Sequence, residues 1–111
     1  MDFMNTKSTD IRDRKRLRQI AHHLDPVVTV GDQGVSDALI AETERALVDH
    51  ELIKVRLHSS DREERALAAQ ALATVCKAEI IQSIGKILVL YRRNPEAKPR
   101  LSNLSRFGAR P

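Results

Sequence analysis

Residues 26–37 read PVVTVGDQGVSD, and this stretch places a strand, a glycine turn and a helix start in direct succession. The apolar run from Val27 to Val30 favours a short strand buried on both faces. Gly31 and Gly34 then bracket a turn, because glycine accepts a positive φ and allows a ligand to approach closely. Ser36 has the side chain of an N-cap for the helix that follows. Free N–H groups at such a helix start attract phosphate, so the turn is a weak signal for phosphate binding.

Apolar residues outside this stretch recur at helical or strand spacing and predict the remaining elements. They indicate a helix from a cap at Thr9 or Asp10 to about His23, a helix from Ser36 to about His50, a strand at Leu52–Leu57, a helix from Ser60 to about Lys77, and strands at Glu79–Ile84 and Ile87–Tyr91. The buried stripe of the third helix is expected to hold Leu67, Ala71, Leu72 and Val75. Gly85 suits the first central position of a type II′ hairpin turn. The order α-β-α-β-α-β-β predicts a single-domain α/β sandwich with a four-stranded mixed sheet.

The 111 residues are enough for one domain with its own core. Residues 1–8 are expected to form a flexible lead-in, and the domain is expected to span residues 9–93. Residues 94–111 are rich in Asn, Pro, Ser and Arg, and Pro95 and Pro99 predict a disordered basic tail. One cysteine excludes an intramolecular disulfide, the first residues lack an apolar signal segment, and no stretch reaches membrane-spanning length. We therefore expect a cytoplasmic protein.

Positive charge is concentrated towards the ends of the chain, whose formal net charge is +4. Residues 92–111 carry six basic residues against one acidic residue, whereas residues 31–91 carry seven against ten. Basic flanks around a mildly acidic middle are typical of a protein that binds a polyanion. The same distribution also fits a solubilising surface with a disordered tail, and composition leaves both interpretations open.

The sequence offers no constellation for catalysis. Cys76 lies beside the buried stripe of the third helix and fits a small core residue better than a nucleophile. His22 and His23 fit a helix C-terminus better than a metal site, because no Cys or second His pair completes a ligand set. The turn at Gly31–Gly34 lacks both the Gly-Lys-Ser/Thr of a P-loop and the third glycine of a dinucleotide fold. We therefore predict no enzyme activity, no metal and no cofactor.

Aromatic residues are too few for a base-stacking platform. They are Phe3, Tyr91 and Phe107, and two of them lie in ends that are expected to be mobile. An RRM or a single-strand-binding OB fold, which stack bases on aromatic side chains, cannot be built from them. Contact with RNA would therefore come from backbone N–H groups, from Arg and Lys side chains, and from shape.

Three ordered segments resemble the signature of the CRM domain, the chloroplast RNA splicing and ribosome maturation domain. They are HHLDPVVTVGDQG at residues 22–34, LIKVR at residues 52–56 and IGKILVLYR at residues 84–92. The resemblance covers roughly residues 10–93, and for a single short domain it indicates the bacterial stand-alone form. It implies a fold akin to the C-terminal domain of translation initiation factor 3. It also implies RNA binding through the Gly-x-x-Gly loop, likened to that of KH domains, and through adjacent basic residues, in association with precursors of the large ribosomal subunit. The family brings no catalytic residues.

The loop departs from the family pattern at its two middle positions. A basic residue often stands there in the family, whereas this chain has Asp32 and Gln33. A carboxylate beside bound phosphate opposes binding by like-charge repulsion. Asp32 therefore either turns away and stabilises the turn, or leaves more of the affinity to the first helix and the basic tail.

We expect a monomeric, non-enzymatic protein that binds precursor large-subunit ribosomal RNA, with ribosomal proteins as further partners. The expected RNA contacts are the loop residues Gly31, Asp32, Gln33 and Gly34, the first-helix residues Arg12, Lys15, Arg16 and Arg18, and the further cations Lys54, Arg56, Lys86, Arg92 and Arg93. The alternative is an adaptor on a ribosomal protein or an assembly GTPase, in which the glycines serve only as a turn. A third hypothesis, an RNA-modifying enzyme, needs a buried reactive side chain.

Overall fold

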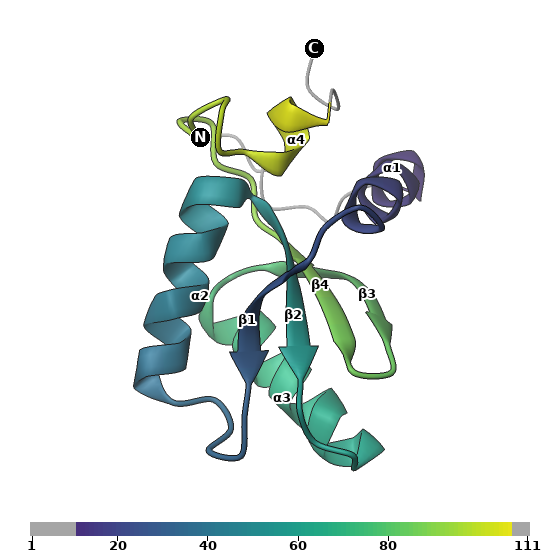
Figure 1. Ribbon diagram of the computed structural model, residues 1–111, viewed down its shortest axis with the longest axis vertical. Helices are drawn as coiled ribbons and strands as arrows, with labels where there is room; N and C mark the ends of the chain where they lie inside the picture. The colour runs from purple at the N-terminus through teal and green to yellow at the C-terminus, as the bar shows by residue number, and fades with distance from the viewer. Residues whose placement is uncertain (1–10, 108–111) are drawn as a thin grey trace.

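The computed structural model describes residues 11–107 (Figure 1). It confirms the expected order of helices and strands and shows one further short helix near the C-terminus. Its elements are α1 (Ile11–Ala21), β1 (Pro26–Val30), α2 (Asp37–His50), β2 (Leu52–Leu57), α3 (Arg62–Val75), β3 (Glu79–Ile84), β4 (Ile87–Tyr91) and α4 (Asn103–Arg106). The expected lead-in at residues 1–8 and the expected cap at Thr9 or Asp10 lie outside the described residues, as do residues 108–111.

The strands form one mixed sheet in the order β1-β2-β4-β3. β1 runs parallel to β2, whereas β4 runs antiparallel to both β2 and β3. The β3–β4 hairpin turns at Gly85, whose φ of +57° is the conformation expected of glycine at that position. The β1–α2 loop and the β3–β4 turn therefore lie at the same end of the sheet (Figure 1). We call it the loop end, and the opposite end the helix end.

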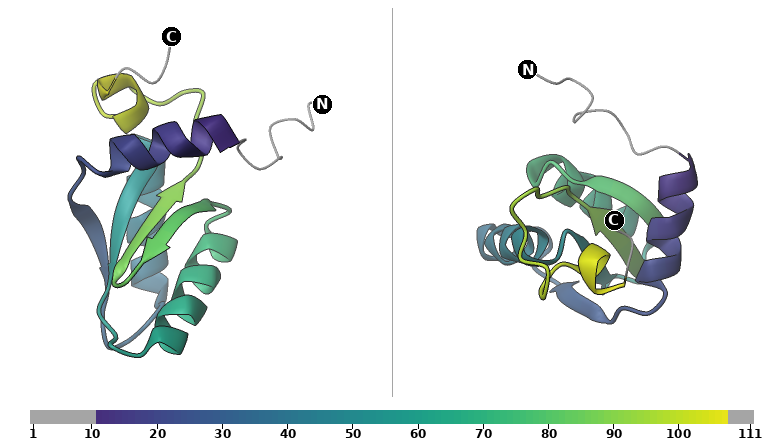
Figure 2. Two further views of the ribbon diagram at one scale, coloured as in Figure 1. Left: turned by 90° about the vertical axis from the view of Figure 1, so that its right-hand side faces the viewer. Right: turned by 90° about the horizontal axis from the view of Figure 1, so that it is seen from above.

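Helices cover the two faces of the sheet unequally (Figure 2). α2 and α3 pack on one face, and this layer of the core includes Val28, Leu47, Val55, Leu72 and Leu90. α1 and α4 pack on the other face at the helix end, and this second layer includes Leu17, Ile20, Leu52, Ile81, Val89 and Leu104. At the loop end of the second face, no helix formed by residues 11–107 packs on the sheet (Figure 2), and we call this part of the second face the uncovered face.

Burial differs from the sequence expectation in β1 and α3. Only alternate residues of β1 are buried, because β1 is an edge strand that α1 does not cover. In α3 only Leu72 of the expected stripe is buried, whereas Leu67 is 71% exposed and Val75 is 51% exposed. The stripe that faces the sheet consists of Ala69, Leu72, Ala73 and Cys76. Its small residues let the helix approach the sheet closely, and a search for large apolar residues misplaces the stripe by one position.

The C-terminal segment, residues 94–107, is ordered, and the expectation of a disordered tail is wrong for it. Ser102 is the N-cap of α4 and its side chain is fully buried. Its hydroxyl donates to Oε1 of the buried Glu51 at 2.7 Å, and the backbone N–H of Asn94 donates to Oε2 of the same carboxylate at 2.7 Å. The amide of Asn103 donates to the carbonyl of Leu52 at 2.7 Å. The segment is therefore held at the start of β2 by buried polar contacts.

Proline does not prevent this order, because Pro95 and Pro99 lie in turns that precede α4. Nδ1 of His50, at the end of α2, donates to the carbonyl of Leu101 at 2.8 Å. Leu104 completes the apolar contact with α1. The physical reason for the wrong expectation is that the partners of the segment lie about fifty residues earlier in the chain, beyond the reach of local periodicity.

Candidate nucleic-acid interface

The loop of Gly31–Gly34 closes through a hydrogen bond from the N–H of Gly34 to the carbonyl of Gly31, at 3.0 Å. Gly34 has a φ of +70°, so its backbone conformation favours glycine, whereas Gly31 does not share this conformation. A Cβ added at either glycine would meet nothing within 4 Å, so the loop is open on its outer side. Directly behind it, Ser36 caps α2 by accepting from the N–H of Leu39 at 3.2 Å. The open Gly31–Gly34 turn is therefore followed directly by the capped N-terminus of α2.

Asp32 is 91% exposed in its side chain, and its Oδ1 lies 3.5 Å from Nε2 of His58. His58 directly follows β2, and its N–H donates to the carbonyl of Val30 at 2.9 Å. The carboxylate of Asp32 therefore reaches sideways to the end of β2. His58 is not among the contacts expected from the sequence, although parallel pairing of the first two strands places it beside the loop.

Two of the expected cations lie beside the loop. Arg56 is exposed and pairs in register with Thr29 of β1 on one side and with Ile87 of β4 on the other. The exposed Lys86 lies in the β3–β4 turn, and its carbonyl accepts from the N–H of Leu57 at 2.7 Å. The sheet therefore brings Arg56, Lys86 and the glycine loop together at the loop end. Lys54 is half-buried and lies two residues before Arg56 in β2, on the same face.

The expected cations of α1 lie at the helix end, across the uncovered part of the sheet face from the loop (Figure 2). Arg12, Lys15 and Arg16 are exposed, and Arg18 is half-buried. Arg14, between them, is engaged with β3, because it forms an ion pair with Glu79 and donates to the carbonyl of Ile80 at 2.8 Å. α1 thus joins the sheet through Arg14.

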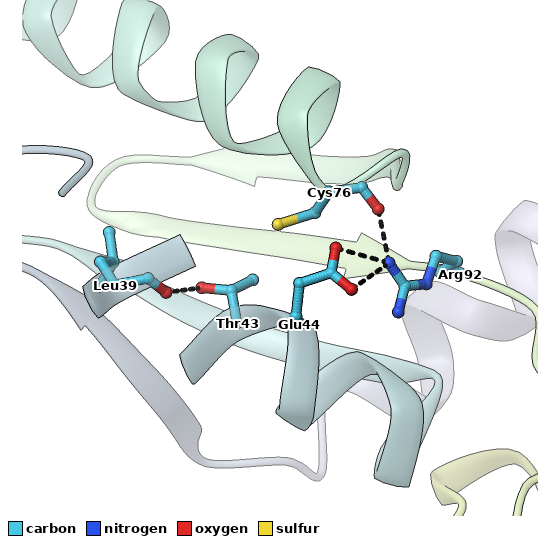
Figure 3. Close-up of polar contacts among 5 residues, drawn as sticks. All are labelled: Leu39, Thr43, Glu44, Cys76 and Arg92. Atoms are coloured by element: carbon cyan, nitrogen blue, oxygen red, sulfur yellow. Dashed lines mark hydrogen bonds and ion pairs between the residues drawn. The ribbon is translucent and has the colours of Figure 1, made fainter. Parts of the chain in front are cut away.

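Arg92, also an expected RNA contact, lies in a structural ion pair on the other side of the sheet (Figure 3). Its Nη1 donates to Oε1 and Oε2 of Glu44 at 2.9 and 3.0 Å, and to the carbonyl of Cys76 at 2.7 Å. It therefore connects α2, the end of α3 and the end of β4. We leave Arg92 out of the candidate interface, whereas Arg93 is exposed at the helix end.

The contacts around Arg92 explain the pKa shift of Glu44, and burial explains that of Cys76. The hydrogen bond from Arg92 lowers the pKa of the Glu44 carboxyl below its ordinary value. Cys76 is fully buried, as a core residue should be, and burial raises the pKa of its thiol. A thiol with a raised pKa is a poor nucleophile. Nearby, the hydroxyl of the buried Thr43 donates to the carbonyl of Leu39 at 2.8 Å, so its polar atom is satisfied (Figure 3).

Other classes of site receive no support from the part of the chain that the structure describes. Residues 11–107 contain no group of three or more His, Cys, Asp or Glu side chains arranged to hold a metal ion. Among the helices formed by these residues, none has the length and apolar character needed to cross a membrane.

Comparison with known proteins extends these observations. The family model of the CRS1/YhbY (CRM) domain matches residues 10–92. The chain is 46% identical over 98 residues to a protein of Haemophilus influenzae named "RNA-binding protein", covering 88% of this chain and 97% of that protein. It is 44% identical over 94 residues to "Probable RNA-binding protein PA4753" of Pseudomonas aeruginosa, covering 85% of this chain and 90% of that protein.

A solved structure shows the same fold. The solution structure of the hypothetical protein SAV1595 from Staphylococcus aureus superposes with a TM-score of 0.72 at 28% sequence identity. The superposition covers 82% of this chain and 95% of that chain. The α/β architecture with a four-stranded mixed sheet is therefore shared with that protein.

Proposed function

The chain belongs to the CRS1/YhbY (CRM) domain family, and from this premise we propose that it is a non-enzymatic RNA-binding protein that docks on ribosomal RNA in precursors of the large subunit. Two relatives carry RNA binding in their names. The observation that carries the proposal is the gathering of the open Gly31–Gly34 loop, Arg56 and Lys86 at one end of an uncovered sheet face.

In this mechanism the loop holds phosphate through backbone groups. The start of α2 presents N–H groups and the positive end of the helix dipole to an anion placed at Gly31–Gly34. Arg56 and Lys86 add formal positive charge on the neighbouring strand and turn. The backbone of the RNA then continues over the uncovered face past Lys54 to the exposed cations of α1. Binding of this kind reads shape and charge more than base sequence.

Asp32 moderates the affinity of this loop. Its contact with His58 holds the carboxylate at the end of β2. This position lets a negatively charged side chain stand next to a phosphate site. Removal of the charge should tighten binding, so we expect Asp32→Asn to raise RNA affinity. The protein acts as a monomer in the cytoplasm in this proposal, and ribosomal proteins are neighbours on the assembling particle.

A salt titration tests the electrostatic part of the proposal. The probe is an in vitro transcript of large-subunit ribosomal RNA, and the measurement is the dissociation constant as a function of salt concentration. Arg56→Met should weaken binding and reduce the log–log salt slope by about one unit, as loss of one phosphate contact requires. Arg45→Met is the matched control, because it removes the same charge from the exposed side of α2. Equal effects of the two variants, or a flat salt response in the wild type, would favour the adaptor hypothesis.

A pair of loop variants tests the role of the glycine turn. Asn and Asp have similar size, and both accept a positive φ more readily than other residues. Gly34→Asn and Gly34→Asp should therefore disturb the fold equally, since both are strained alike at a φ of +70° and a Cβ at Gly34 meets nothing within 4 Å. Only Gly34→Asp places a negative charge at the loop, so it should lose more RNA affinity than Gly34→Asn. Identical affinities would remove the loop from the mechanism.

A further inference from the structure

Four planar side chains gather at the helix end of the sheet, where α1 and α4 both terminate. The rings of His23 and Phe107 are stacked, with centroids 6.1 Å apart and an angle of 14° between their planes. The ring of His22 meets that of His23 edge-on, at 5.9 Å and 85°. Cζ of Arg106 lies 5.8 Å from the centroid of the Phe107 ring. We call these four residues the aromatic cluster.

The aromatic cluster is on the surface, yet it is held in place. Phe107 is 39% exposed, and both histidines and Arg106 are exposed as well. The N–H of Phe107 donates to the carbonyl of Asn103 at 3.2 Å, and Asn103 is itself buried and bonded to β2. Rings fixed by buried neighbours but left open to solvent lose little conformational freedom when a flat ligand stacks on them.

Basic side chains of α1 lie in a row that ends at the aromatic cluster. The N–H of His22 donates to the carbonyl of Arg18 at 3.1 Å, so helical geometry continues to His22. Residues three and four apart lie on one side of a helix, and Lys15, Arg18 and His22 have this spacing. Arg106 adds a cation from α4. A ligand with flat rings joined by phosphates would thus meet rings at the cluster and cations beside it.

We propose that the aromatic cluster binds an unpaired nucleobase of a single-stranded RNA segment. His, Phe and Arg side chains all present flat faces on which unstacked bases settle. The proposal rests on the RNA binding proposed above and adds a second contact, at the opposite end of the sheet from the glycine loop. Arg106 and Phe107 lie outside residues 10–92, the part of the chain that the family model matches.

This site corrects the expectation that no base-stacking platform can form. That expectation rests on Phe and Tyr alone, without the histidines, and on a disordered tail around Phe107. Order in the C-terminal segment brings Phe107 to His23, which lies 84 positions earlier in the sequence.

A tryptophan reporter tests stacking directly. The chain contains no tryptophan, so Phe107→Trp introduces a single fluorophore into the cluster. Titration with single-stranded oligoadenylate should quench its emission, whereas a fully paired RNA duplex of the same length should not. Unchanged emission at saturating oligoadenylate, or equal quenching by duplex and single strand, would overturn the proposal.

Affinity measurements separate this site from the electrostatic contacts. The probe is an RNA hairpin with a single-stranded extension. Phe107→Leu keeps an apolar side chain but removes the ring, and it should weaken binding roughly five- to 150-fold, the usual range for one stacked base. The salt slope should stay that of the wild type, because stacking releases no counterions, whereas Lys15→Met should lower it by about one unit. A thermal midpoint near that of the wild type shows that the fold is intact, and Phe107→Tyr should restore affinity.

The outcomes for the two proposals are distinct. A wild type that binds the hairpin in a salt-dependent manner, while Phe107→Leu and His23→Leu leave affinity unchanged, refutes the stacking site and leaves the proposed function standing. The cluster would then be a packing contact between α4 and α1, or a contact for protein. A wild type without affinity for RNA refutes the proposed function itself.

Discussion

Replacement of Arg92 with methionine should destabilise the fold without weakening RNA binding. Arg92 donates three hydrogen bonds of 2.7–3.0 Å, two to the Glu44 carboxylate and one to the Cys76 carbonyl. Hydrogen bonds to charged groups contribute about 1.5–3 kcal/mol when buried. The Glu44 side chain is 42% exposed, so its share is reduced by solvent towards about 1 kcal/mol. With about 1 kcal/mol for the carbonyl left without its donor, the loss is about 2 kcal/mol.

Urea denaturation followed by circular dichroism measures this loss. For a domain of this size, about 2 kcal/mol corresponds to a fall of roughly 10 °C in the thermal midpoint. Methionine retains the aliphatic stem of Arg92, so the change reports mainly on the polar contacts. RNA affinity, measured by fluorescence anisotropy with the ribosomal transcript, should equal that of the wild type.

Arg56→Met is the opposite case and serves as the control. Arg56 is exposed on the uncovered sheet face, so its removal should leave stability within about 0.5 kcal/mol of the wild type and weaken RNA binding. The reasoning is refuted if Arg92→Met is as stable as the wild type, or if it loses as much RNA affinity as Arg56→Met. A double variant with Glu44→Gln should lose less stability than the sum of the single variants, because the two residues share one contact.

Three further predictions concern the remaining polar contacts. Arg92 lowers the pKa of Glu44 in the folded state, so the pair stabilises the fold fully above the unfolded glutamate pKa of about 4.3. This stabilisation is lost as the pH falls through the lower pKa of the folded state. The free energy of unfolding, measured from pH 7 to pH 3, should therefore fall more in the wild type than in Arg92→Met. Glu51→Gln should lower the free energy of unfolding by about 2 kcal/mol and speed amide exchange across the C-terminal segment, because the buried carboxylate accepts from both Asn94 and Ser102. Glu42→Gln, at an exposed position, is the control and should change neither quantity. The thiol of Cys76 should resist iodoacetamide in the native protein and react only on unfolding, because burial raises its pKa and blocks access; rapid native alkylation would show that the α3 end opens.

Local sequence pattern was sufficient for most of the fold. Alternation in residues 52–57 and the capping residue Ser36 report on neighbours within a few positions, and the strand bounds and this cap agree with the structure. The third helix is capped by Asp61, one residue after the expected start at Ser60, because the Asp61 carboxylate accepts from the N–H groups of Glu63 and Glu64. The glycine turn at Gly85 was equally readable, because its conformation depends on the residue itself. These are interactions that a short window contains in full.

Long-range contacts were beyond this reach. Arg92 and Glu44 are separated by 48 positions, and Ser102 and Glu51 by 51, so neither pair produces a periodic signal. Local pattern consequently groups Arg92 with the surface cations and predicts disorder for the C-terminal segment. The candidate interface was partly accessible, since parallel pairing of the first two strands would have placed Arg56 and His58 beside the loop.

Both edges of the sheet are irregular, and this affects how the molecule can associate. β1 begins with Pro26, which has no N–H to donate, and its register with β2 shifts between Pro26 and Val28. On the opposite edge, the register of β3 with β4 shifts between Ile80 and Gln82. Irregular edges are poor templates for an incoming strand and suppress edge-to-edge aggregation. The irregular edges therefore disfavour pairing with a strand of a second copy. The uncovered face and the two ends of the domain remain as the surfaces available to a partner.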